Sequence, residues 1–257
     1  MALIAMVVYS TDENKKDYCL RKTLIHLGRT VDFSKHRMMV SINGVTNDTL
    51  EILDSFNCMI SAQILNHTNL GTAEALNKVI KERKPGESVV KIDDDIVIKQ
   101  QGWADIMQEA IDIDPTIGVI GLKRKDCIQS PDSENPAFKS ELVLLPHIPS
   151  HRWITVEKSY DIMGSCTMFN SLLIDKIGYS RQPGTYGFED NLYCHRSRLA
   201  GFYNCFLNSI EIDHIDEGKT PFQKWKEQHS SELFPEYHRL VHAMINGEES
   251  IYYNPFA

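Results

Sequence analysis

The sequence predicts an α/β fold in which helices flank a mostly parallel central sheet. The first observation is that short apolar stretches alternate with amphipathic ones along the first half of the 257-residue chain. The second is that polar residues directly follow several of the apolar stretches. In open α/β sheets ligands bind beyond the carboxyl ends of the strands, so Tyr9-Ser10-Thr11, Asn43-Gly44 and Asp93–Asp95 are expected to line one crevice.

The elements of the first half follow from the spacing of their apolar residues. Strands are expected at residues 3–10, 37–44, 58–65, 88–92 and 117–122. Helices are expected at residues 13–28, from a cap at Thr46 or Asn47 onward, at 71–84 and at 102–113. Pro85 and Pro115 end the last two helices, since proline cannot continue a helix.

The second half begins with a different pattern. Residues 126–151 hold four prolines among polar residues, which predicts a long irregular excursion that shapes the binding site. Strands are expected at 153–158, 161–169, 202–207 and 209–215, and helices at 171–178, 189–200 and 220–246. No linker interrupts these elements, so residues 1–257 are expected to form a single domain.

Composition excludes some classes of function. The net charge of −8 argues against a sequence-independent grip on nucleic acid, although a local basic site stays possible. The first apolar stretch, "ALIAMVVY", is too short to span a bilayer, and no transmembrane segment or export signal is expected. Six cysteines without any Cys-x-x-Cys spacing are typical of reduced thiols, so a cytoplasmic location is expected.

Three consecutive aspartates follow the strand in "VVKIDDDIVI". Asp93 and Asp95 would project to the same side of an extended segment, whereas Asp94 would point away toward the scaffold. Carboxylates are preferred ligands of Mg²⁺ and Mn²⁺, which commonly bind through one or two of them together with substrate phosphates. The pattern therefore favours a divalent cation site, and the alternative is a solvated strand end.

Two further segments carry candidate chemistry. Glu189 and Asp190 open a predicted helix beside Tyr186 and Phe188, whose rings would wall a pocket mouth where a carboxylate can act as general base. The alternative is an acidic pair stabilised by the helix dipole. His214 follows a strand, where it is either a metal ligand or a structural histidine. A zinc site at Cys194, His195 and Cys205 is rejected because the spacing is wrong.

Taken in order, these segments resemble the GT-A fold glycosyltransferases, and most of all family 2 and the galactosyltransferase group. The resemblance spans roughly residues 3–225. Its motifs are "VYSTDENKKDYCLRKTL" at the first strand, "NLGTAEALNKVI" as the Asn-x-Gly-x-Ala-x-x-x-Asn helix, "KIDDDIVI" as the D-x-D strand end, and "GSCTMFNSLLIDKIGYSRQPGTYGFEDNLYCHRSRLAGF" as the acceptor segment. Two family features are absent: the Pro-x-Tyr/Phe-Asn first turn and the Gln-x-x-Arg-Trp signature of processive synthases.

The resemblance implies a metal-dependent, inverting transfer of one sugar from a nucleotide sugar, expected to be a UDP-sugar, to an acceptor hydroxyl. It implies Mn²⁺ or Mg²⁺ as cofactor, held by Asp95, Asp93 and His214. It implies Asp190 as the base and Glu189 as the group that orients the acceptor. Donor contacts are implied for Tyr9, Thr11, Asn69, Asp93, Asp94 and Lys219.

By the same resemblance, residues 1–125 would bind the nucleotide sugar, and residues 126–257 would form a smaller acceptor-binding and catalytic subregion. Two other classes stay open: a sugar nucleotidyltransferase, and a non-catalytic carbohydrate-binding protein of the same fold. The first usually has a glycine-rich loop after its first strand, and "YSTDENKKDY" has no glycine. The sugar, the oligomeric state and the acceptor, modified DNA included, stay open.

Overall fold

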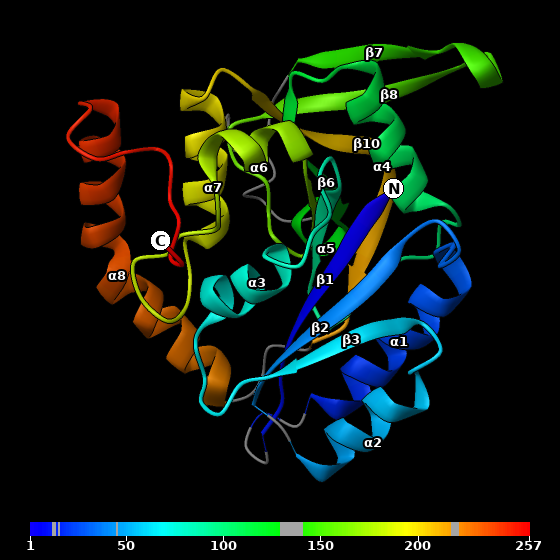
Figure 1. Ribbon diagram of the computed structural model, residues 1–257, viewed down its shortest axis with the longest axis vertical. Helices are drawn as coiled ribbons and strands as arrows, with labels where there is room; N and C mark the ends of the chain where they lie inside the picture. Colours follow the sequence, from blue (N-terminus) through cyan, green and yellow to red (C-terminus); the bar gives the residue numbers. More distant parts are fainter. Residues whose placement is uncertain (12–13, 15, 45, 129–140, 217–220) are drawn as a thin grey trace.

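The computed structural model describes residues 1–257 except 12, 13, 15, 45, 129–140 and 217–220 (Figure 1). Its strands are β1 (Ala2–Tyr9), β2 (Arg37–Gly44), β3 (Ile60–Leu65), β4 (Ser88–Ile92), β5 (Ile96–Val97), β6 (Ile117–Arg124), β7 (Leu142–His147), β8 (Arg152–Ser159), β9 (Cys166–Phe169) and β10 (Tyr203–His214). Its α-helices are α1 (Asp17–Thr30), α2 (Asn47–Ser55), α3 (Thr72–Ile80), α4 (Trp103–Ile113), α5 (Lys125–Ile128), α6 (Ser171–Ile177), α7 (Glu189–Leu199) and α8 (Pro221–Ile245). A short 3-10 helix, η3, covers Ile148–Ser150.

The strands form one sheet in the order β3-β2-β1-β4-β9-β6-β10-β8-β7, and β5 pairs with β10 beside it. β1 is parallel to β2 and β4, β2 is parallel to β3, and β6 is parallel to β10. β9 runs antiparallel between β4 and β6, and β8 runs antiparallel between β10 and β7. The other strands of this path all point one way, which confirms the predicted mostly parallel sheet.

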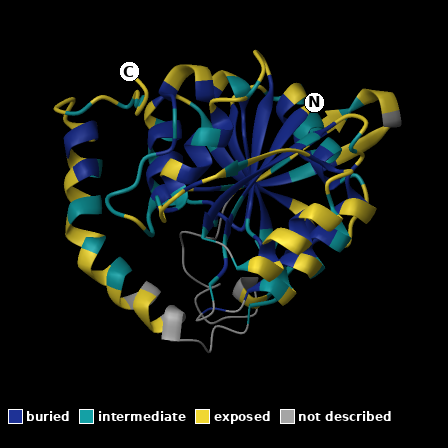
Figure 2. Cartoon of the chain, turned by 60° about the horizontal axis from the view of Figure 1, so that its bottom comes forward, coloured by how far each residue is buried: buried dark blue, intermediate teal, exposed yellow. Residues whose placement is uncertain are grey.

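Helices cover both faces of the sheet, so its strands are the most deeply buried part of the chain (Figure 2). On one face α1, α2 and α4 pack their apolar sides against the strands, with Leu24, Leu53 and Trp103 among the buried contacts. On the other face α3, α6 and α7 do the same, through residues such as Leu76 and Leu173. This two-sided cover explains why the central strands read as continuous apolar runs.

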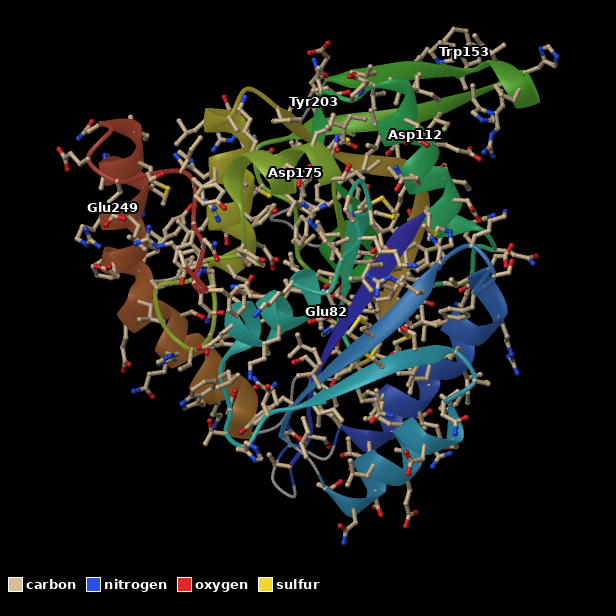
Figure 3. All side chains as sticks on the ribbon, in the orientation of Figure 1. Glu82, Asp112, Trp153, Asp175, Tyr203 and Glu249 are labelled. Carbon is tan, nitrogen blue, oxygen red and sulfur yellow. The ribbon has the colours of Figure 1, made fainter. Side chains whose placement is uncertain are left out.

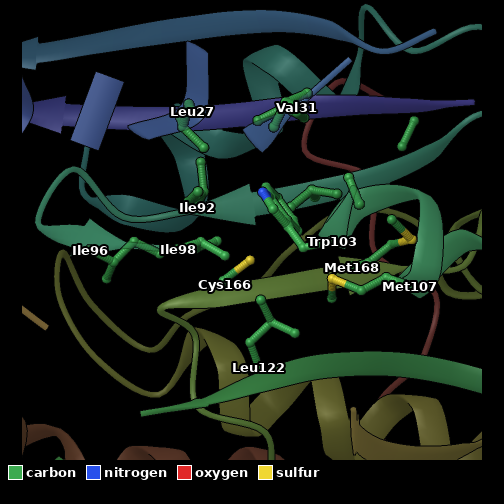
Figure 4. Close-up of a cluster of buried hydrophobic side chains, with 14 of the residues drawn as sticks. Leu27, Val31, Ile92, Ile96, Ile98, Trp103, Met107, Leu122, Cys166 and Met168 are labelled. Carbon is green, nitrogen blue, oxygen red and sulfur yellow. The ribbon is translucent and has the colours of Figure 1, made fainter. Parts of the chain in front are cut away.

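Trp103 anchors the first of these faces. Its side chain is fully buried and lies among Ile92, Met107 and Met168 (Figure 4). Its indole Nε1 donates to Thr30 Oγ1 at 3.3 Å, so the polar end of the ring is satisfied. The pair fixes the start of α4 against the end of α1.

Two expectations for the second half are wrong. Residues 142–147 form strand β7, antiparallel to β8, where irregular chain was expected. β7 is an edge strand. It tolerates Pro146 because the outer side of an edge strand forms no hydrogen bonds with a neighbouring strand. The ribbon it forms with β8 carries the 64% exposed Trp153 away from the body of the molecule (Figure 3). Residues 129–140 of the expected excursion lie outside the described residues.

The second error concerns residues 202–215, where two strands were expected and one strand, β10 (Tyr203–His214), is present. The pairing of β10 with β6 shifts register between Leu207 and Glu211. Such a bulge bends a strand and puts extra residues in one strand without ending it. Asn208, which separates the two expected strands, lies at this irregularity.

α8 lies beside α7 at the edge of the fold (Figure 1). It contacts α7 through a small apolar cluster of Leu192, Leu240 and Met244. Pro235 lies within α8 itself. Among the residues described, no helix combines the length and the apolar character that crossing a membrane requires. The free thiols described are those of Cys19, Cys58, Cys166, Cys194 and Cys205.

Candidate active site

A cavity of about 500 Å³ lies beyond the carboxyl ends of β1, β2 and β4. β1 and β2 run side by side away from the N-terminus and end together there (Figure 1). Tyr9, Asn43 and the three aspartates that follow β4 all line the cavity. The crevice expected from the topology of an α/β sheet is therefore present. Glu189 and Asp190 line the same cavity, although they are about a hundred positions further along the chain.

Polar and glycine residues shape the side of the cavity formed by β1, β2 and α3. Asn43 Nδ2 donates to Asn69 Oδ1 at 2.7 Å, and Asn43 Oδ1 accepts from the amide of Leu70 at 2.9 Å. Gly71, just before α3, has a φ of +80°, and a Cβ there would collide with the backbone of Thr185. The glycine of the Asn-x-Gly motif thus lets the chain from α3 touch the loop before α7.

The other predicted donor contacts lie in different places. The half-buried Tyr9 lines the cavity, and Gly44 leaves room for its ring, since a Cβ there would lie 2.6 Å from Tyr9 Cδ2. The Thr11 amide donates to Asn14 Oδ1 at 2.8 Å, and Thr11 is not among the residues that line the cavity. Lys219 lies outside the described residues.

The three aspartates form a turn between β4 and β5, and each has its own surroundings. Asp93 is 39% exposed and lies 3.9 Å from Lys91 Nζ. Asp94 and Asp95 are nearly buried and both face Lys16, with Asp95 Oδ2 only 2.6 Å from Lys16 Nζ. The expectation that Asp94 points away from the site is wrong, because the segment turns where an extended one was assumed.

His214 lies beside Asp95 because β10 pairs antiparallel with β5, with His214 opposite Ile96. The His214 Nε2 atom is 3.5 Å from Asp95 Oδ2. Burial by itself would raise the pKa of Asp95, but His214 and the charge of Lys16 outweigh it and hold that pKa well below its usual range. Asp95 is therefore an anion at neutral pH.

These residues fit a divalent cation only as a partial site. Across the described ranges, no group of three or more His, Cys, Asp or Glu side chains is placed to hold a metal ion. Asp95 Oδ1, however, is buried without a hydrogen-bond partner, and an imidazole nitrogen lies nearby. One carboxylate and one imidazole leave most positions of a cation to other ligands, as is usual for Mg²⁺ sites completed by substrate phosphates.

Glu189 and Asp190, which line the same cavity, form the first turn of α7 and share one buried lysine. Lys91 Nζ lies 3.0 Å from Asp190 Oδ1 and 3.2 Å from Glu189 Oε1. With Asp93, three carboxylates surround this single ammonium. Burial raises the pKa of Asp190 to about 7; Lys91 opposes the rise, and the charges of Glu189 and Asp93 add to it. A carboxylate that titrates near neutrality is suited to general-base chemistry.

One side of this pair is closely packed. Gly164, in the segment before β9, lies so close that a Cβ would collide with the Asp190 carboxylate and with Lys91 Nζ. Phe188 precedes the pair in a left-handed conformation with a φ of 64°. This backbone geometry orients the first turn of α7 toward the cavity.

The predicted aromatic mouth is only half correct. Tyr186 lines the cavity, whereas Phe188 stacks on Tyr237 of α8 with ring centroids 4.7 Å apart. Trp225 of α8 also lines the cavity, and its ring centroid lies 5.9 Å from that of Tyr186. The contribution of α8 was missed because an aromatic residue near a helix start has no local feature that assigns it to a site.

Two lysines were also missed. Lys91 stands alone in the apolar strand "SVVKI", and a charge in a buried strand is a signal that could have been used. Lys16 lies in a polar segment and gave no such signal.

The basic residues 123–125 have different surroundings. Arg124 lines the cavity, whereas Lys123 pairs with Glu157 and Lys125 with Asp213.

No family model matches the chain, and no curated protein matches it. Solved structures do match. TarS 1-349 of S. aureus in complex with UDP superposes with a TM-score of 0.64 at 17% identity, covering 94% of this chain and 64% of that chain. The mannosyltransferase PcManGT of Pyrobaculum calidifontis, in complex with GDP-Man and Mn²⁺, superposes with a TM-score of 0.63 at 15% identity. The match covers 87% of this chain and 59% of that chain.

GalNAc-T7 with UDP, GalNAc and Mn²⁺ gives a TM-score of 0.60 at 12% identity, covering 84% of this chain and 44% of that chain. This chain has the GT-A fold. It spans less than two thirds of the length of these three proteins. At identity this low, the superpositions show the GT-A fold alone. The chemistry depends on the side chains of the cavity.

Proposed function

We propose that the protein is a glycosyltransferase that moves one sugar from a nucleotide sugar to an acceptor hydroxyl with inversion. The observation that carries the proposal is that Asp95 and the Glu189–Asp190 pair line one cavity, with His214 Nε2 3.5 Å from Asp95 Oδ2. The first set suits a diphosphate with its cation, and the second suits an attacking hydroxyl. The GT-A fold supports the same assignment.

The proposed donor is a UDP-sugar. Tyr9 offers an aromatic face for the base at the end of β1, and Asn69, held by its hydrogen bond from Asn43, lines the same cavity. TarS and GalNAc-T7 are described in complex with UDP, and PcManGT in complex with GDP-Man. These complexes support a nucleoside diphosphate as the common element.

The proposed cofactor is Mn²⁺ or Mg²⁺, which Asp95 and His214 would hold, with Asp93 close to the ribose or the ion. When bound, such an ion offsets the charge that develops on the leaving diphosphate. Asp95 contributes a full negative charge, because its pKa lies well below the usual range. The remaining ligand positions are left to the substrate.

On the acceptor side Asp190 removes the proton from the attacking hydroxyl, and Glu189 orients the acceptor. The acceptor oxygen forms a bond to the anomeric carbon as the bond from that carbon to the diphosphate breaks, and the nucleoside diphosphate leaves with the electron pair. A single displacement from the face opposite the leaving group inverts the configuration. With a pKa of about 7, Asp190 can both accept and release a proton near neutral pH.

We further propose that residues 1–257 act as one domain, with the donor bound mainly by residues 1–125 and the acceptor mainly by 126–257. The continuous sheet supports this, since β9 of the second half lies between β4 and β6 of the first. A cytoplasmic location is also proposed, which the free thiols of the described cysteines support.

Release of UDP tests the proposed function. The protein is incubated with a panel of UDP-sugars and GDP-mannose plus Mn²⁺, without acceptor, and nucleoside diphosphate is measured. A transferase releases it slowly because water replaces the acceptor. A parallel incubation holds UTP and a sugar 1-phosphate, and inorganic pyrophosphate is measured there. Release of inorganic pyrophosphate without release of nucleoside diphosphate in the first assay would indicate a nucleotidyltransferase, and no turnover in either would indicate a binding protein.

A further inference from the structure

Lys16 lies immediately before α1, and its ammonium group reaches into the aspartate turn. Nζ lies 2.6 Å from Asp95 Oδ2, 3.0 Å from Asp216 Oδ2 and 4.0 Å from Asp94 Oδ1. The Lys16 side chain is only 10% exposed. A buried ammonium needs anionic partners, and these three carboxylates supply them.

The dependence is mutual, because the carboxylates also need a cation. Like charges repel, and the repulsion is strong where little water is present. A positive charge is therefore needed between the carboxylates of Asp94, Asp95 and Asp216. The other buried lysine among the described residues of this cavity is Lys91, and it binds the Glu189–Asp190 pair. Within the aspartate turn, Lys16 is therefore the lysine that pairs with Asp94 and Asp95, whereas Asp93 lies 3.9 Å from Lys91 Nζ.

The two oxygens of Asp95 differ in their contacts. Oδ2 contacts Lys16 Nζ and lies 3.5 Å from His214 Nε2. Oδ1 is buried without a hydrogen-bond partner among the described residues. A divalent cation that used Asp95 and His214 would thus lie next to the Lys16 ammonium, and the two positive charges would repel each other.

We propose that Lys16 is a resident counter-ion that a divalent cation has to displace in order to reach Asp95. This rests on the metal-dependent transfer proposed above. The consequence is a coupling between cation and nucleotide. Without nucleotide, Lys16 competes with the cation and the cation binds weakly. With UDP, the diphosphate adds negative charge to the cavity, so the ammonium that the cation displaces from Asp95 gains a new anionic partner.

The test measures Mn²⁺ binding by the electron paramagnetic resonance signal of free Mn²⁺, with and without UDP. The wild type is compared with Lys16→Met, which removes the ammonium, and with Lys16→Gln, which keeps a donor for Asp95. Lys35→Met is the matched control, because Lys35 is 61% exposed and pairs with Asp32 and Asp105 away from this cavity.

Without UDP, both Lys16 variants should bind Mn²⁺ about tenfold more tightly than the wild type, because a neighbouring positive charge is gone. UDP should strengthen Mn²⁺ binding strongly in the wild type and in Lys35→Met, and much less in the Lys16 variants. Folded Lys16 variants that bind Mn²⁺ equally or more weakly without UDP would overturn the proposal and make Lys16 a purely structural partner.

If neither variant folds without metal, the wild type still decides the question. The ¹⁵N signal of a buried, ion-paired lysine ammonium is observable, and it should change when Mg²⁺ and UDP are added together. An unchanged signal in the saturated complex would overturn displacement. None of these readouts needs turnover, so a failure of the proposed transfer reaction would appear separately, as absent UDP release.

Discussion

Lys91 Nζ lies between the two oxygens of the Asp190 carboxylate, at 3.0 Å from Oδ1 and 3.1 Å from Oδ2. Lys91 belongs to β4, and Asp93 follows it by two residues, so the same strand end carries the aspartate turn and holds the candidate base. The contact holds Asp190, 99 positions further along the chain, against the end of β4. It also makes the titration of Asp190 depend on Lys91.

The first prediction concerns the pH dependence of turnover. The acidic limb of kcat/KM should have its midpoint near pH 7, where Asp190 loses its proton. Lys91→Met removes the charge that opposes the rise in the Asp190 pKa, so the limb should move to higher pH. Steady-state rates between pH 5 and pH 9 measure this, with Lys35→Met as the charge control. A limb that stays in place would show that Asp190 is not the titrating group.

The second prediction concerns stability. An acid whose pKa is raised on folding binds more protons in the folded state, so its contribution to the free energy of unfolding falls as pH rises from about 4 to about 7. Asp190→Asn removes this term, so the variant should gain stability relative to the wild type over that window, on the order of a few kcal/mol at most. Urea unfolding at pH 5 and pH 8 measures the difference.

A helix-capping role for Asp190 predicts the opposite trend. A carboxylate at the start of a helix is favoured by the helix dipole, so its replacement would cost stability at pH 8, on the order of 1 kcal/mol. The stability of Asp190→Asn relative to the wild type, compared between pH 5 and pH 8, therefore separates the two interpretations.

The third prediction tests the close packing at Gly164. Gly164→Ala places a methyl group against Asp190 and Lys91, so the pair has to shift and turnover should fall by about tenfold or more, since small misplacements of reacting groups are costly. Gly28→Ala in α1 is the control, because its Cβ would lie 3.5 Å from Met59 Sδ, an ordinary contact. Equal turnover in both variants would show that the Lys91–Asp190 geometry does not limit the reaction.

The fourth prediction is that UDP binding requires a divalent cation. Asp95 Oδ1 and His214 Nε2 are the groups that would hold it. Titration calorimetry with Mn²⁺ should show UDP binding, and EDTA should abolish or strongly weaken it. His214→Ala should weaken UDP binding in Mn²⁺ and change it little in EDTA. Unchanged affinity after chelation would remove the metal from the account.

The sequence was informative where local pattern decides structure. The apolar runs of β1, β2 and β4 are buried on both faces of the sheet, so they are recognisable without any partner, and their carboxyl ends locate the cavity. Thr46 caps α2 as expected, since a capping box is a local arrangement. β7 was missed because it lies in the proline-rich stretch 126–151 and itself contains Pro146, which outweighed its short apolar run Leu142–Leu145.

The rest depends on contacts between distant positions. Lys16 and Asp95 are 79 positions apart, and Lys91 and Asp190 are 99 apart. No spacing within the sequence indicates that each lysine binds its own set of carboxylates. The order of the motifs located the acidic residues, whereas the cations that bind them became visible only through the tertiary structure.

The most direct test of the account is to compare Asp95→Asn with Asp190→Asn in two assays, UDP affinity in Mn²⁺ and turnover of the UDP-sugar. Asp95→Asn should weaken UDP binding, because it removes the anion that faces the cation and the diphosphate. Asp190→Asn should leave UDP affinity nearly unchanged and lower turnover about 10²–10⁴-fold, the usual cost of losing a general base. An Asp190→Asn variant that turns over as fast as the wild type would contradict the account.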